Sequence, residues 1–274
     1  MPVKLLLCSE EDIASVNIRD ALTQCVKWES DGNILYHDGM AMMSIPGIHI
    51  RAEDIDRDAR DAGIDAEEII FLSRHKAASG IPTLTVHPIG NFHNADLGGR
   101  PQTLVPSSPG TMTCLLRSLA ASDTEHFQVS FEVTHHGPYV SVPATFIEIG
   151  SDASQWDNRD AARMLASALL NYERKDHVSV IGIGGGHYAP RFTEVALKYE
   201  INFGHMIPEY AFKDSDDDDI VRMIGASAEN TFTKLAYVNK KAMKADVYKR
   251  ISGLAGSCGL EVIGSGDLDV IRSV

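Results

Sequence analysis

Apolar residues fall into short runs along the chain, and most of these runs are separated by segments with helical spacing. In the segment from Ala161 to Tyr172, and again from Phe192 to Tyr199, apolar residues recur every three or four positions, which predicts helices that pack one face on a sheet. Pro190 suits the first turn of the second helix. The apolar runs predict strands at 3–8, 33–37, 67–73, 83–86, 127–133, 144–150, 178–184, 234–238 and 260–264. This alternation predicts an α/β fold.

The length and composition of the chain favour one globular domain. With 274 residues it can bury a sizeable core, and we expect a single α/β domain over 1–274. The content of 44% hydrophobic and 23% charged residues is typical of soluble globular proteins. The apolar start at 3–8 is too short for a membrane span and lacks a signal-peptide pattern. The four cysteines have no paired spacing, as expected of reduced thiols. We therefore expect a cytoplasmic protein without membrane association; as a separate expectation, we take it to be a monomer.

The net charge limits the possible partners. A charge of −13 and a pI near 5.2 argue against binding nucleic acid over a broad surface, so such a partner would need a local basic patch. The stretch at 234–250 is the clear candidate, because Asp246 is its single acidic residue. A solvated helix surface is the simpler interpretation of this composition alone. The basic residues of the stretch are Lys234, Lys240, Lys241, Lys244, Lys249 and Arg250.

Histidine is distributed in a way that indicates chemistry. In an open α/β sheet, ligands bind outside the carboxyl ends of the strands, so side chains just past several strands can converge. Neutral imidazole is the commonest metal ligand and is suited to proton transfer near neutral pH. Any single histidine at a strand end could simply be hydrogen-bonded and half-buried, so the set is the stronger signal. Five of the 11 histidines follow predicted strands, namely His75, His87, His135, His136 and His187.

The adjacent pair His135 and His136 poses a geometric question. In the preceding run, 127–133, the odd positions are apolar and the even positions are polar. If the strand continued, the two imidazoles would point to opposite faces. Gly137-Pro138 ends the run, and a bend there could bring both into one pocket. The sequence leaves both arrangements open.

A glycine-rich turn lies between the strand at 178–184 and the helix that starts near Pro190. It contains Gly184, Gly185 and Gly186, but it lacks the dinucleotide fingerprint and the P-loop lysine. Its backbone N–H groups beside a helix N-terminus would suit an oxyanion or a phosphate. A tight turn that needs positive φ is the alternative explanation.

Two further polar residues lie in apolar surroundings. Glu148 falls within the apolar run 144–150, where its buried charge must pair with a cation, a metal or a substrate ammonium. His205, in the segment INFGHMIP, could be a core residue or an additional ligand.

Six motifs of the chain together resemble the archaeal and plant type of D-aminoacyl-tRNA deacylase. They run in order over most of the chain, and only the N-terminal part and the basic C-terminal region match loosely. The resemblance implies a three-layer α/β/α fold with a phosphorylase/hydrolase-like mixed sheet, related to bacterial peptidyl-tRNA hydrolases. The motifs are SRH at 73–75, LTVHPIGN at 84–91, THHGP at 134–138, VPATFIEIGS at 142–151, GIGGGHYAP at 182–190 and FGHMIPEYA at 203–211.

The resemblance also implies an activity and a cofactor. The reaction would be hydrolysis of the ester between a D-amino acid and the 3′-terminal ribose of tRNA, with zinc bound. We expect catalytic roles for His135, His136 and Glu148. Zinc ligands are expected to be a subset of His87, His135, His136, His187 and His205. Substrate contacts are expected from His75, from Gly184, Gly185 and Gly186, and from Lys240, Lys241 and Lys244.

Two other classes of function use the same features. Another metal-dependent hydrolase on this fold, such as a peptidyl-tRNA hydrolase, an amidohydrolase or a peptidase, would need the same histidines. A non-catalytic RNA-binding module would bind tRNA without turnover, but it is disfavoured because no base-stacking aromatic residues accompany the histidines.

Overall fold

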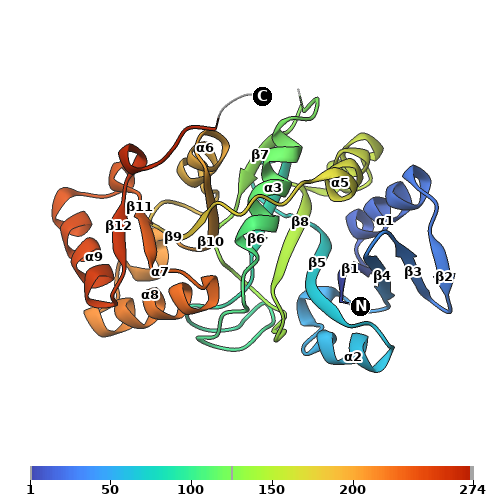
Figure 1. Cartoon of the computed structure of the whole chain (residues 1–274), viewed down its shortest axis with the longest axis horizontal. Helices are drawn as coiled ribbons and strands as arrows, with labels where there is room; N and C mark the ends of the chain where they lie inside the picture. Colours follow the sequence, from blue (N-terminus) through green and yellow to red (C-terminus); the bar gives the residue numbers. More distant parts are fainter. Residues whose placement is uncertain (1, 125, 272–274) are drawn as a thin grey trace.

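The strands form two sheets that carry helices on both faces (Figure 1). The computed structural model describes residues 2–124 and 126–271. The predicted α/β fold with a large mixed sheet is confirmed. The first sheet has the order β2 (Glu29–Asp31), β3 (Ile34–His37), β4 (Met40–Ile45), β1 (Val3–Ser9), β5 (Ala66–Arg74), β8 (Ala144–Gly150), β6 (Thr83–Pro88) and β7 (Gln128–Phe131). The second has the order β10 (Ile201–Ile207), β9 (Val178–Ile183), β11 (Leu235–Val238) and β12 (Glu261–Ile263).

Each of the nine predicted strand runs contains a strand, and three strands were missed. β2 is entirely polar, and β4 is rich in methionine, which favours no strand pattern. β10 is fully buried although Gly204 and His205 interrupt its apolar residues. Both predicted helices are present, as α5 (Arg159–Asn171) and α6 (Pro190–Lys198).

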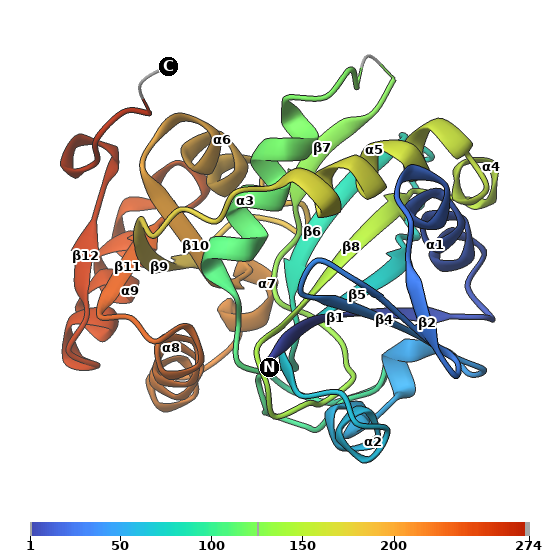
Figure 2. The ribbon, with the colours of Figure 1, turned by 45° about the vertical axis from the view of Figure 1, so that its right-hand side comes forward.

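The helices enclose the two sheets in layers. α1 (Ile13–Cys25) and α5 cover one face of the eight-stranded sheet, and α2 (Ile55–Asp61) lies on the other (Figure 2). α3 (Pro109–Ala120) packs on both sheets, on β6 and β7 as well as on β10. α6 covers one face of the four-stranded sheet, while α8 (Asp217–Thr231) and α9 (Ala245–Ser257) cover the other. The shorter helical turns are η1 (His49–Arg51), α4 (Ala153–Trp156), α7 (Glu209–Phe212), η2 (Lys240–Ala242) and η3 (Ser265–Asp267).

Strand direction matters for the location of the site. β1, β4, β5 and β8 are parallel to one another, whereas β6 pairs with β8 in the antiparallel direction. β7 is parallel to β6, so these two strands run antiparallel to β1, β4, β5 and β8. β5 and β6 therefore run in opposite directions, and their carboxyl ends point to opposite ends of the sheet along the strand axis.

The two sheets share one hydrophobic core and are joined by backbone hydrogen bonds. Phe131 on β7 and Phe203 on β10 belong to the same buried cluster, with ring centroids 6.3 Å apart. Beyond β7, the Val133 N–H donates to the carbonyl of His187 at 3.0 Å, and the Thr134 N–H donates to that of Met206 at 3.0 Å. We propose on this basis that the chain folds as a single domain. Within residues 2–124 and 126–271, no helix is long and apolar enough to span a membrane.

A single domain predicts that damage to one sheet destabilises the other. Phe203→Ala removes a fully buried ring from the four-stranded sheet and should lower the free energy of unfolding by about 3–5 kcal/mol. Fluorescence of Trp28 and Trp156, which pack on the core beside the eight-stranded sheet, should report this loss in urea together with far-UV circular dichroism. Phe232→Ala, at a residue that is 75% exposed, is the control and should change stability little. If the urea midpoint measured by tryptophan fluorescence is the same in Phe203→Ala as in the wild type, the proposal is contradicted.

Candidate active and metal-binding site

The five histidines that follow predicted strands do lie together, but over one face of the eight-stranded sheet. In the antiparallel ladder of β6 and β8, His87 lies opposite Phe146, and Thr85 lies opposite Glu148. His87 and Glu148 thus reach the site from within strands, while His75 arrives just after β5. Convergence beyond the carboxyl ends of all strands was therefore the wrong arrangement, because β6 and β7 run against β5 and β8.

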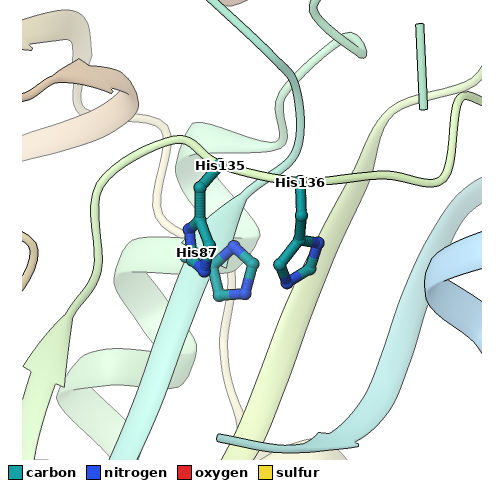
Figure 3. Close-up of side chains that lie close together, drawn as sticks. All are labelled: His87, His135 and His136. Carbon is teal, nitrogen blue, oxygen red and sulfur yellow. The ribbon is translucent and has the colours of Figure 1, made fainter. Parts of the chain in front are cut away.

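His87, His135 and His136 form the first group of converging imidazoles (Figure 3). One ligand nitrogen from each lies within 4.8 Å of the others. His135 and His136 descend from the same loop onto His87 of β6, so both histidines enter one pocket. His136 adopts a left-handed φ of 41°, which bends the chain after the strand. The bend resolves the question that the sequence left open.

The hydrogen bonds of this group fix which nitrogen faces inward. Nδ1 of His87 donates to the carbonyl of Pro88 at 3.0 Å, and Nδ1 of His135 donates to that of Val133 at 2.8 Å. Nδ1 of His136 donates to the carbonyl of Gly137 at 2.7 Å. A carbonyl can only accept, so in a neutral ring the proton resides on Nδ1 and the lone pair on Nε2. Histidines that bind a metal through one ring nitrogen usually donate the other to a carbonyl or carboxylate in this way.

Burial keeps two of these rings in the neutral form. It lowers the pKa of His135 well below its ordinary value, and the nearby His87 and His136 add to the effect. Burial, together with His87, lowers the pKa of His136 to about 4. Nε2 of His87 is buried and has no hydrogen-bond partner among the described residues. Burial opposes a charge on His87, but Glu148 raises the pKa of His87, so a metal ion at Nε2 would take the place of a proton there.

His75, Glu132 and His187 form a second group beside the first. Nδ1 of His75 lies 3.1 Å from Oε1 of Glu132, and Nε2 of His187 lies 2.8 Å from Oε2. Neither carboxylate oxygen, however, meets hydrogen-bond geometry with any residue that the structure describes. The ring of His187 lies 4.6 Å from that of His135, so the two groups adjoin. This group can also hold a metal ion.

Sequence reasoning missed Glu132. It occupies an even position of the alternating run 127–133, where alternation predicts the polar face. In the structure Glu132 is fully buried, because its face turns toward His75, His135 and His187. Its position on the polar face of the strand that leads into the histidine pair was the signal that could have identified it.

Glu148 links the two groups. Its Oε2 lies 3.5 Å from Nδ1 of His75 and 3.8 Å from Nε2 of His87. Burial opposes its charge, but the adjacent imidazoles of His75 and His87 outweigh burial and hold the pKa of Glu148 below its usual range. Burial likewise opposes a charge on His75, yet Glu132 and Glu148 raise the pKa of His75 to about 11. Nε2 of His75 also contacts the Tyr188 hydroxyl at 2.9 Å.

Two predicted site residues are engaged elsewhere. His205 is fully buried, with Nδ1 3.0 Å from Oγ1 of Thr134 and Nε2 2.9 Å from the carbonyl of Val105. Both ring nitrogens have protein partners, so His205 is a core residue rather than a ligand. Gly184 donates its N–H to the carbonyl of Ile207 at 2.8 Å and is therefore not a free oxyanion donor. Gly184 and Gly185 have φ of 102° and 97°, as a tight turn requires.

The basic stretch is split by the fold. Lys234 precedes β11, whereas Lys240, Lys241 and Lys244 follow its other end. Asn239, at the start of this segment, donates its N–H to the carbonyl of Ile183 at 2.8 Å, next to the glycine turn that leads to His187. Three of the lysines therefore lie beyond the carboxyl ends of the strands of the four-stranded sheet, the same end from which the turn after β9 leads to His187.

Comparisons with known proteins relate the chain to one family. Residues 62–263 match the family model described as D-aminoacyl-tRNA deacylase. A relative of that name from Methanosarcina mazei is 34% identical, covering 94% of this chain and 91% of its own. One from Archaeoglobus fulgidus is 34% identical and covers 96% of each chain. Another, from Methanococcoides burtonii, is 36% identical over 98% of this chain. This chain spans only 58% of the length of that longer relative.

A solved structure is also similar over nearly the whole chain. The protein, described as a conserved protein of unknown function, AF0625, is 33% identical. The match covers 98% of this chain and 99% of the other, with a TM-score of 0.87. Together with the family model and the archaeal relatives, it leads to one conclusion. The chain belongs to the D-aminoacyl-tRNA deacylase family.

Proposed function

We propose that the protein hydrolyses the ester bond of D-aminoacyl-tRNA and releases the D-amino acid and the tRNA, as a step in translation quality control. One observation carries the proposal: the segment that matches the deacylase family, 62–263, contains every residue of the two ligand groups. We further propose that the protein acts in the cytoplasm, because aminoacyl-tRNA is used there, and that it acts as a monomer.

We propose that zinc is the metal. Imidazole nitrogens and a carboxylate are the donor set of catalytic zinc sites. His87, His135 and His136 would hold one ion through Nε2, and His75, Glu132 and His187 offer a second place. Zinc so bound supplies Lewis-acid polarisation of the ester carbonyl and activation of water.

The chain's own residues would bind the substrate and move the proton. Glu148 is the carboxylate that adjoins both groups, so it can take the proton of the attacking water or accept a hydrogen bond from the substrate ammonium. When the second group holds no metal ion, His75 keeps its proton, because Glu132 and Glu148 raise its pKa, and it can donate that proton toward the departing ribose oxygen; its Nδ1 lies 3.5 Å from Oε2 of Glu148. The hydroxyl of Tyr188 keeps the His75 ring in place. Lys240, Lys241 and Lys244 would attract the phosphates of the acceptor end.

The zinc assignment predicts that removing a histidine of the first group weakens zinc binding, whereas removing a histidine elsewhere does not. His136→Ala should weaken zinc binding by about 100-fold or more, beyond the about 10–100-fold typical of changing a residue that only supports a ligand. His37→Ala, at a histidine that contacts the Lys27 carbonyl outside the site, is the matched control and should bind zinc normally. Titration calorimetry with zinc and metal analysis after dialysis provide the measurement. Unchanged affinity in His136→Ala would exclude the first group as the metal site.

The catalytic assignment predicts a loss of turnover. His135→Ala and His136→Ala should each fold, and at least one should lower kcat on D-tyrosyl-tRNA by about 100-fold or more, the scale of a lost acid–base group. Assays with peptidyl-tRNA and with small amides separate this activity from that of the rival hydrolases. If both variants keep near-normal kcat, His135 and His136 are bystanders. If the wild-type protein prefers amides or peptidyl-tRNA, the proposed activity is wrong.

The basic surface predicts an effect on tRNA binding that depends on salt. Replacing Lys240, Lys241 and Lys244 together by glutamate should raise KM, and the salt slope should fall by about 1 for each phosphate that the protein no longer neutralises. The matched control places the same three substitutions at lysines that adjoin the opposite ends of the strands, Lys175, Lys198 and Lys234. Equal salt slopes in the two triple variants would refute the role of this surface.

A further inference from the structure

Three aliphatic residues are among those that line the pocket beside the ligand groups, together with charged residues such as Arg74 and Lys76. The pocket has a volume of about 270 Å³ and is lined by His75, His136 and Glu148 among others. Ile48, Ile50 and Leu97 also line it. Leu97 is 56% exposed, although single exposed leucines are common on protein surfaces. What distinguishes Leu97 is that it faces a cavity together with two further aliphatic residues from a distant segment.

The loop that carries Leu97 is fixed in place. Its Gly99 N–H donates to Oε1 of Glu53 at 2.6 Å, and Arg100 donates to both carboxylate oxygens of Asp54 at 3.1 and 3.0 Å. The same guanidinium stacks on the ring of Tyr139 at 3.8 Å. Gly98 has a φ of 81°, and a side chain there would overlap the carbonyl oxygen of Ile50. Leu97 is therefore held against the segment of Ile50 rather than left on a free loop.

The segment of Ile48 and Ile50 is fixed by the residue between them. His49 is buried, and its Nε2 lies 2.8 Å from the carbonyl of Leu72. Its ring meets Phe146 edge-on at 5.3 Å, and Phe146 stacks on His87 at 5.1 Å. The two isoleucines are thus positioned by the same phenylalanine that supports a ligand histidine.

The aliphatic wall lies within reach of the proposed reaction centre. The carbonyl of Leu97 accepts a hydrogen bond from the N–H of Gly137, the residue after His136, at 3.2 Å. In an aminoacyl ester, the side chain leaves the carbon next to the scissile carbonyl, so it must lie beside the reacting group. A volume of about 270 Å³ is just below the usual range of ligand pockets, which is about 300–1,000 Å³. The pocket suits an aminoacyl group rather than a whole nucleotide.

We propose that Leu97, with Ile48 and Ile50, forms the subsite for the side chain of the esterified D-amino acid, and that Leu97 sets a preference for large apolar side chains over small ones. This inference rests on the proposed function. The wall removes apolar side-chain surface from water, and the gain grows with each methylene that is buried. The effect belongs to substrate selection, because Leu97 has no polar side-chain atom with which to act on the ester.

The test is a selectivity ratio measured on the full-length, zinc-loaded protein. The ratio of kcat/KM for D-tyrosyl-tRNA to that for D-alanyl-tRNA should fall about tenfold in Leu97→Ala, the lower end of the range by which an apolar pocket discriminates between side chains. The fall should come mainly from a higher KM for D-tyrosyl-tRNA. Leu97→Met, which keeps an apolar side chain of similar size, should restore most of the ratio.

The matched control is Leu197→Ala on α6, at a leucine that is 38% exposed and does not line the pocket. The selectivity ratio of Leu197→Ala should equal that of the wild type. An unchanged ratio in Leu97→Ala, or an equal loss on both substrates, would overturn the subsite while the deacylase activity stands. Absence of turnover by the wild-type protein on both substrates would overturn the proposed function and the subsite with it.

Discussion

The structure of the site depends on two carboxylates buried under one face of a sheet. Glu132 is fully buried and Glu148 is 2% exposed, and an uncompensated ion in such a place costs several kcal/mol. Their near neighbours are imidazoles, with His75 facing both carboxylates. A protonated imidazole can compensate a negative charge as a cation, and a neutral imidazole can instead bind a metal ion. The buried carboxylates thus need positive charge nearby, which protonated histidines or a metal ion held by histidines can provide.

The fold meets this constraint by reversing two strands. The register of the antiparallel ladder pairs His87 with Phe146, which puts His87 on the same face as Phe146 and Glu148, and the chain that leaves β7 returns over that face. The left-handed turn at His136 then places both histidines of the loop above His87. The parallel four-stranded sheet adds His187 from the turn that follows β9. One site is therefore assembled from both sheets, which share a core.

The sequence predicted the elements better than their directions. Periodicity was sufficient for strands with continuous apolar runs, such as β5 and β8, but not for β10, where Gly204 and His205 interrupt the pattern. Their burial is made favourable by distant partners, Thr134 and Val105 for His205, which no local pattern reveals. The position of five histidines after strand runs indicated a shared site. Glu132 was missed because alternation marks a polar residue as exposed, whereas His75, His135 and His187 surround Glu132 and bury it.

The central claim is that Nε2 of His87, His135 and His136 is reserved for zinc by the backbone carbonyls that take Nδ1. X-ray data collected on either side of the zinc absorption edge, from crystals of the zinc-loaded protein, test it most directly. The account predicts an anomalous difference peak about 2.0–2.1 Å from each of the three Nε2 atoms. A peak bound through Nδ1, or strong zinc peaks only at surface carboxylates, would contradict it.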